Sequence, residues 1–287
     1  MLLDFIKNGL VSGILYSLMA IGFALVYNTT KIFHIAAAAF YVFAAYMFYW
    51  FVDYFNWPII LAACFAIVLT MGLSLLTDVS IYRPLNRRKA SNNVAMIASI
   101  GVMTVIVNVL IMCFKSGTKM IDGSISPLVG NTTITEREMW LFVAGCIAIA
   151  LFLVFIWKTP WGMRFRALSA DNILYETMGY NTSRTRALVF LMSGAFIAIG
   201  SCLRAYDIGL DPHMGMDVLI NALVAMILGG VGRFGTCVLG GVTLGLVQAL
   251  TDKWFPLNWE DAITFVLLLL LLFVRPQGIA GYKQRTV

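Results

Sequence analysis

The chain has 287 residues, of which 61% are hydrophobic and only 12% are charged. Soluble domains contain roughly 45–50% apolar and about 25% charged residues, so this composition excludes a disordered chain and argues against a water-soluble globular fold. At about 20 residues per membrane span, eight spans would take roughly 160 residues. The sequence therefore predicts an all-α, polytopic transmembrane helix bundle of about eight spans with short loops.

Apolar segments recur along the chain at membrane length. They occupy residues 5–27, 32–52, 58–81, 94–114, 139–157, 187–206, 217–250 and 261–274. The first has no basic flank or small-residue cleavage site, so it is expected to be a retained span. The segment 217–250 is too long for one helix and is interrupted by glycines, which are Gly229, Gly230, Gly232 and Gly235. We expect two helices joined there by a glycine-rich turn, with Gly241 and Gly245 supporting close helix packing.

Loop charges predict the orientation in the membrane. The loops at 82–93 and 158–186 and the tail from residue 275 are rich in Lys and Arg, whereas 53–57 and 207–217 carry acids and no Lys or Arg. The positive-inside rule places the basic regions in the cytoplasm, and alternation of the spans then places the N-terminus outside. The net charge of +6 is explained in this way, so no nucleic-acid partner is expected.

The cytoplasmic loop at 158–186 contains one amphipathic stretch. Pro160 and Gly162 are expected to stop the preceding helix. The residues 167–179 predict a short helix that Gly179 ends. Its shared apolar side is expected to contain Leu168, Ile173, Leu174 and Met178. Such a helix fits either the membrane surface or a docking site for a cytoplasmic partner.

Sequence motifs for catalysis are missing. The pattern G-x-G-x-x-G at 230–235 lies between apolar runs rather than in a βαβ unit, so it is not a dinucleotide site. No Walker A motif occurs, so any ATP used in transport must be hydrolysed by a partner subunit. His34 and His213 have no neighbours at metal-ligand spacing, and the cysteines lie singly. The chain is expected to hold no metal or cofactor and to be no enzyme.

Polar residues inside apolar segments are the remaining candidates for a functional site, because lipid disfavours them. The candidates for a translocation path are His34, Asn108, Asp217 and Asn221. The alternative for each is an interhelical hydrogen bond, which is the commoner role. Asp78 and Arg83, five residues apart near a cytoplasmic end, are expected to be interfacial anchors.

Several stretches, in order, carry a resemblance. They are Tyr16-Ser17-Leu18-Met19-Ala20, Ile81-Tyr82-Arg83-Pro84-Leu85, Ile97-Ala98-Ser99-Ile100-Gly101, Thr159-Pro160-Trp161-Gly162-Met163, Ile227-Leu228-Gly229-Gly230-Val231-Gly232 and Arg275-Pro276-Gln277-Gly278. Together they resemble the LivH-like permeases of branched-chain amino acid importers of the ATP-binding cassette (ABC) type. One departure is at 32–40, which keeps His34 but lacks the Asn and Gly of the family's "NFAHG" element. Leucine-like amino acids, urea, short amides and small carboxylates therefore remain open as substrates.

The resemblance implies that residues 1–287 form the transmembrane domain of an importer in the bacterial inner membrane. It also implies partners: a second permease subunit, identical or homologous, two cytoplasmic ATPase subunits and an extracytoplasmic solute-binding protein. The ATPases would push on a coupling helix that includes Ala170, Asp171, Glu176 and Gly179.

Two other classes of function remain as alternatives. A self-sufficient secondary transporter or channel should place ionisable groups mid-membrane for ion coupling, and this sequence has few. An intramembrane enzyme would need clustered acids or histidines, whereas His34 and His213 are expected on opposite sides of the membrane.

Overall fold

The computed structural model describes residues 2–121, 136–254, 260–274 and 278. The helices are α1 (Leu2–Thr30), α2 (Ala37–Asp53), α3 (Ile59–Thr77), the π-helix η1 (Asp78–Tyr82), α4 (Arg83–Arg87), α5 (Asn92–Phe114), α6 (Glu136–Lys158), α7 (Pro160–Ala170), α8 (Asn172–Thr177), α9 (Thr182–Asp207), α10 (Met214–Gly229), α11 (Thr236–Trp254) and α12 (Glu260–Val274). No strand occurs within these ranges, where β pairing is limited to one bridge between Lys119 and Leu210. The predicted all-α class is confirmed.

Five helices are long and apolar enough to cross a membrane: Ile6–Thr30, Ile59–Arg87, Asn92–Phe114, Arg137–Lys158 and Thr182–Asp207. Four shorter apolar helices accompany them: Ala37–Asp53, Met214–Gly229, Thr236–Thr251 and Ala262–Leu271. The polytopic bundle expected from the apolar runs is therefore present. The long run at 217–250 divides into α10 and α11 at the glycine-rich turn, as predicted.

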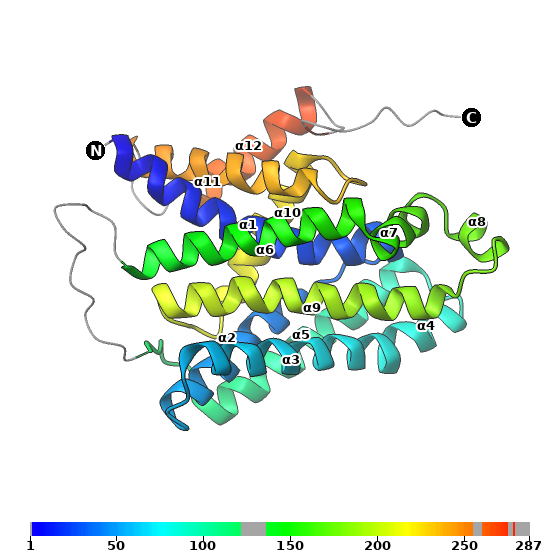
Figure 1. Cartoon of the computed structure of the whole chain (residues 1–287), viewed down its shortest axis with the longest axis horizontal. Coiled ribbons are helices and arrows are strands. Elements are labelled where there is room, and N and C mark those ends of the chain that lie inside the picture. Colours follow the sequence, from blue (N-terminus) through cyan, green and yellow to red (C-terminus); the bar gives the residue numbers. More distant parts are fainter. Residues whose placement is uncertain (1, 122–135, 255–259, 275–277, 279–287) are drawn as a thin grey trace.

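Helix α1 is the centre of the bundle. The most apolar stretch of Ile6–Thr30 is 89% buried, whereas the corresponding stretches of Asn92–Phe114 and Arg137–Lys158 are only 17% and 28% buried. Figure 1 shows α1, α6, α9 and α3 running along the long axis of the molecule, and α9 packs against the other three. The apolar surfaces of α3, α5 and α6 are therefore left for lipid or other subunits.

Small residues let α1 and α11 approach closely. A Cβ added at Gly13 would lie 2.9 Å from the Val242 Cα atom, and one added at Gly245 would collide with the backbone of Gly9 and Gly13. The small-residue packing predicted from Gly241 and Gly245 is confirmed, with α1 as the partner helix.

The two ends of the bundle differ in charge, as the loop analysis predicts. The basic segments around α4, α7 and α8 lie together at one end of the molecule in Figure 1. Arg83, the first residue of α4, donates to the carbonyl of Ser183 at the start of α9 (3.4 Å). At the other end, the bridge from Lys119 to Leu210 joins the segments that follow α5 and α9. The basic end is the expected cytoplasmic one. The charges at 122–135, at 275–277 and beyond residue 278 lie outside the described residues.

Candidate functional site

The segment between α6 and α9 forms two helices instead of the single helix predicted at 167–179. Thr159 caps α7, because its hydroxyl accepts the Gly162 N–H (3.1 Å), and Pro160 begins the helix. Proline suits this first position because its fixed φ is already helical and no hydrogen bond is lost there. The prediction that Pro160 and Gly162 only end a helix was therefore incomplete, since α7 starts at once.

Asp171 separates the two helices. Its backbone is extended, at φ −155° and ψ 113°, and its carboxylate accepts the N–H groups of Ile173 and Leu174 at 2.8 and 3.0 Å. An Asp in this position is a strong N-cap, so α7 ends at Ala170 and α8 begins at Asn172. The prediction of one continuous coupling helix was wrong, because Asp171 divides this stretch into two helices. Glu176 lies in α8, and Gly179 follows its end at φ +81°, where it was expected as the stop.

Helix α8 exposes apolar side chains and buries an aromatic one. Ile173, Leu174 and Met178 are 76%, 53% and 65% exposed, whereas Leu168 of α7 is buried. The shared apolar side predicted for these residues was wrong, because the break at Asp171 turns α8 away from α7. The exposed apolar side chains at α8 form a surface of the kind that binds another protein or the membrane surface.

One buried side chain fastens α8 to the bundle. Tyr175 is 3% exposed, and its hydroxyl shares a hydrogen bond of 2.8 Å with Thr185 near the start of α9. The Tyr175 ring also stacks on Tyr180, with centroids 5.1 Å apart. A displacement of α8 therefore acts directly on the first turn of α9.

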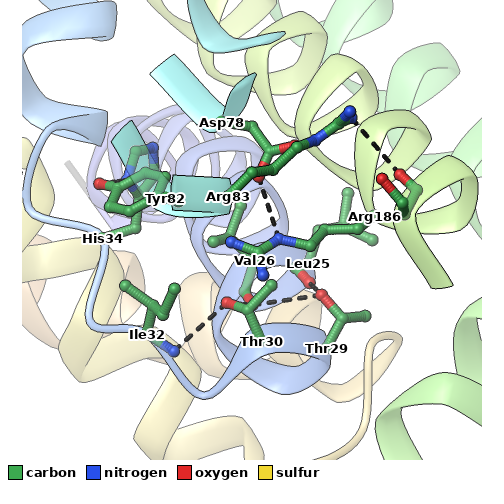
Figure 2. A network of polar contacts seen from close by, with 11 residues as sticks. Leu25, Val26, Thr29, Thr30, Ile32, His34, Asp78, Tyr82, Arg83 and Arg186 are labelled. Carbon is green, nitrogen blue, oxygen red and sulfur yellow. Dashed lines mark hydrogen bonds and ion pairs between the residues drawn. The ribbon is translucent and has the colours of Figure 1, made fainter. Parts of the chain in front are cut away.

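Asp78 is the centre of a buried ion-pair network. The network includes Arg186, the residue that follows Thr185 in α9. The Asp78 carboxylate accepts from Arg83 Nε at 2.8 Å and from Arg186 Nε at 3.0 Å, and Asp78 itself is completely buried. Figure 2 shows Asp78 between the two arginines. The prediction of an interfacial anchor was wrong for Asp78, which is buried, whereas the Arg83 side chain is 26% exposed. Arg186, which belongs to the basic loop at 158–186 in the sequence, is buried inside the bundle.

The residues between Asp78 and Tyr82 form a π-helix, a turn type frequently found at functional sites. At its end, the Tyr82 hydroxyl shares a hydrogen bond of 2.8 Å with His34 Nδ1. The His34 and Tyr82 rings lie side by side in Figure 2, with centroids 5.5 Å apart. A path of hydrogen bonds, ion pairs and short helical segments thus joins α8 to His34.

His34 lies in the non-helical break between α1 and α2. It is completely buried, and its Nε2 atom has no hydrogen-bond partner among the described residues. The Ser99 hydroxyl accepts the Ala36 N–H at 2.7 Å and so ties the break to α5. On the other side, Thr29 and Thr30 bond back to carbonyls of α1, and Thr30 accepts the Ile32 N–H (Figure 2). The break is therefore held by side chains of α1, α5 and η1.

The other path candidates lie elsewhere. Asn108 is exposed and lines a cleft of about 190 Å³ together with His213 and residues of α2 and α10. Asp217 is exposed in the first turn of α10. Asn221 is buried, and its side-chain oxygen accepts a hydrogen bond from Gln248 Nε2 at 3.0 Å. Asn221 therefore has the alternative role, an interhelical hydrogen bond between α10 and α11. The structure does not bring these residues together with His34.

The glycine-rich turn lies at the basic end of the bundle. Gly230 and Gly232 adopt φ values of +104° and +100°, which favour glycine, and Gly229 packs tightly on the Thr236 backbone. Gly235 lies immediately before the first residue of α11. The side chain of the buried Asn28 accepts the Gly232 N–H at 3.1 Å and so ties the turn to α1. Sequence reasoning missed Asn28, although a polar residue directly after the apolar segment 5–27 was a visible signal.

Comparisons with known proteins agree with the fold and composition. A family model described as "Branched-chain amino acid transport system / permease component" matches residues 5–272. The LivH permease protein of a high-affinity branched-chain amino acid transport system from Salmonella typhimurium is 26% identical, over 96% of this chain and 94% of its own length. The corresponding BraD protein of Pseudomonas aeruginosa is 28% identical, also over 96% and 94%. Among solved structures, PsaBC from Streptococcus pneumoniae in complex with Fab covers 99% of this chain and 98% of its own, with 11% identity and a TM-score of 0.49.

The family model, the LivH and BraD relatives and the membrane-length helices define an ABC-type permease, a multi-pass protein of the bacterial inner membrane. The chain belongs to the family of permease components of branched-chain amino acid transport systems.

Proposed function

We propose that residues 1–287 form a single permease domain that pairs with a second permease subunit, identical or homologous, and imports a small polar solute under the control of cytoplasmic ATPases. Branched-chain amino acids are the first substrate class, because the LivH and BraD relatives are permease proteins of systems for them. ATP is used by the partner subunits, and a solute-binding protein delivers the substrate to the outer end. Urea, short amides and small carboxylates are the further candidates.

The observation that carries this proposal is the path from α8 to His34. At one end, α8 presents exposed Ile173 and Leu174 for docking. At the other end, the α1–α2 break is held by the Tyr82–His34 hydrogen bond. Between them lie the Tyr175–Thr185 hydrogen bond and the Asp78–Arg186 ion pair. Coupling between distant sites needs a contiguous network with an element that can rearrange, and the α1–α2 break and the π-helix are such elements.

The translocation path is proposed to run along the faces of α2, α5 and α10 that form the cleft at Asn108 and His213. Helix α2 follows the break that holds His34, so a change in the break reorients α2 and with it one wall of this cleft. The proposed entry point for a delivered solute is near Asp217, in the first turn of α10. Asn221 is assigned a structural role because its side chain is already bonded to Gln248.

Replacing Ile173 and Leu174 with serine is expected to weaken ATPase binding about tenfold or more. Each substitution removes an exposed apolar side chain worth about 1–2 kcal/mol when buried in an interface. The measurement is co-purification of the ATPase subunits with the tagged permease, followed by ATP-dependent uptake. Ile208→Ser, at the opposite end of the bundle and 60% exposed, is the matched control. Equal binding by the double variant and the control would reject α8 as the docking element.

The alternative function is that of a self-sufficient secondary transporter or channel. It is tested by measuring whether an ion gradient drives uptake by the purified chain alone in proteoliposomes. The proposal predicts no concentrative uptake until ATPases, binding protein and ATP are added. Uptake that follows a proton or sodium gradient without these partners would instead identify a secondary transporter.

Substituting Tyr82 with phenylalanine is expected to lower solute uptake several-fold at an unchanged rate of ATP hydrolysis. The change removes the hydroxyl that bonds to His34 and leaves the buried Nδ1 atom without that partner, so it costs about 1–3 kcal/mol of stability. It leaves α8 untouched. Uptake and hydrolysis are measured together in proteoliposomes that contain the assembled transporter. Tyr54→Phe, at an exposed position near the other end, is the control. A Tyr82 variant with an unchanged ratio of uptake to hydrolysis would show that the path carries no coupling.

A further inference from the structure

A cavity of about 720 Å³ lies at the basic end of the bundle, beside the start of the α1–α2 break. Its walls come from the turn after α1, the end of α6, the second half of α7 and the glycine-rich turn before α11. The polar lining includes Lys31, Arg166, Ser169, Arg233 and Thr236. No carboxylate is among its lining residues within the described ranges.

Two of the three cations, Lys31 and Arg166, form no ion pair with an acidic side chain among the described residues. Arg166 lies with its guanidinium 4.7 Å from the centroid of the Trp157 ring, and its buried Nε–H has no hydrogen-bond acceptor in the described part of the chain. Partial burial lowers the pKa of the Lys31 ammonium below its ordinary value, and no acid offsets that loss of hydration. A buried donor without an acceptor is unfavourable, so an anion in this cavity would give the Arg166 Nε–H an acceptor and Lys31 a counter-charge.

Much of the remaining lining is apolar, which favours a lipid over a small inorganic ion as the ligand of this cavity. Leu153, Ile156 and Phe234 line the same cavity as the cations. Trp157 is 61% exposed at the cytoplasmic end of α6, where aromatic residues mark the level of the lipid headgroups. The cavity thus joins a basic wall to an apolar one at the depth where the phosphate and the first acyl carbons of a phospholipid meet.

Helix α11 adds a further favourable charge. It runs for 19 residues and begins at Thr236, which lines the cavity next to Gly235. The N-terminus of a helix carries a partial positive charge and free N–H groups, which favour a phosphate placed there. This contribution supplements the side-chain cations.

We propose that this cavity binds the phosphate-bearing headgroup of an anionic phospholipid from the cytoplasmic leaflet. Lys31 and Arg166 hold the phosphate, and Leu153, Ile156 and Phe234 contact the start of the acyl chains. Basic pockets between helices on the cytoplasmic side are a known mode of recognition for such lipids. The site is independent of the solute that the permease carries.

The test is native mass spectrometry of the full-length chain, extracted in detergent with equal amounts of phosphatidylglycerol and phosphatidylcholine. We expect selective retention of phosphatidylglycerol, reduced about fivefold or more in Arg166→Gln and in Lys31→Asn, in line with about 1 kcal/mol for each lost charge near the membrane surface. Asparagine is chosen because Lys31 adopts φ +57°, which asparagine tolerates. The control is Arg164→Gln on the same helix, whose guanidinium lies over Trp161 and Tyr180 rather than in the cavity.

A series of thermal-shift measurements distinguishes a phospholipid headgroup from free inorganic phosphate as the ligand. Phosphatidylglycerol in mixed micelles is expected to raise the Tm of the unmodified chain and of Arg164→Gln, but not that of Arg166→Gln or Lys31→Asn. Inorganic phosphate at the same concentration is expected to give no shift. An equal shift with inorganic phosphate would overturn the assignment to a lipid. Equal retention of the two lipids, or retention unchanged in both cavity variants, would overturn the site.

Discussion

Exchange of Asp78 for asparagine is expected to destabilise the permease by about 3–5 kcal/mol, because it leaves the buried Arg186 without its counter-charge. The carboxylate is completely buried and is shared by Arg186 and Arg83. Asparagine keeps the shape and loses the charge, so the effect reports the ion pairs rather than a cavity. The measurement is the Tm and the yield of monodisperse protein after detergent extraction.

A double-mutant cycle with Arg186→Gln tests whether the pair acts as a unit. When both charges are removed, the loss is expected to be clearly smaller than the sum of the two single losses, since no unpaired buried charge is then left on that side. Asp53→Asn is the control, because its carboxylate accepts only an exposed hydrogen bond from Tyr49. Additive losses in the cycle would contradict the geometry of Figure 2.

The second large effect is expected from Gly245→Ala. The added methyl group would collide with the backbone of Gly9 and Gly13, which cannot move aside as a flexible side chain can. The two helices must separate, and overpacking of this kind costs about 1–3 kcal/mol. Because α1 is the most buried of the long apolar helices, its displacement should lower both the Tm and the yield of folded protein.

Gly72→Ala and Gly101→Ala are the matched controls, with the same change inside helices α3 and α5. A Cβ at either position meets nothing within 4 Å, so the higher helix propensity of alanine should leave stability unchanged or raise it by up to about 1 kcal/mol. If Gly245→Ala is as stable as these two variants, α1 and α11 do not pack as closely as described.

Features that depend on local pattern could be predicted from the sequence. The apolar runs gave the helices because membrane spans have a known length. Gly241 and Gly245 indicated close packing because a spacing of four places both on one helix face. Gly179 was expected to end a helix and does so with a positive φ. The charges of the loops grouped correctly at one end for the same local reason.

The candidate site could be predicted only in part, because its residues are distant in sequence. Arg186 pairs with a carboxylate 108 positions earlier, and Tyr82 bonds to a histidine 48 positions earlier. Periodicity cannot show such pairs, so Arg186 looked like one more basic loop residue. The break at Asp171 was also missed, since the apolar spacing across it imitates one helix. A capping Asp followed by an apolar pair was the signal for two.

The ion pairs of Asp78 also bear on the order in which the chain is made. Arg83 follows Asp78 by five residues, whereas Arg186 follows it by 108. At typical rates of protein synthesis, Arg186 emerges roughly 5–20 s after Asp78. During that interval Arg83 is the available counter-charge for the carboxylate at the end of α3. Arg83 can therefore pair with Asp78 before Arg186 has been synthesised, and the Asp78–Arg186 pair can form only once the start of α9 is present.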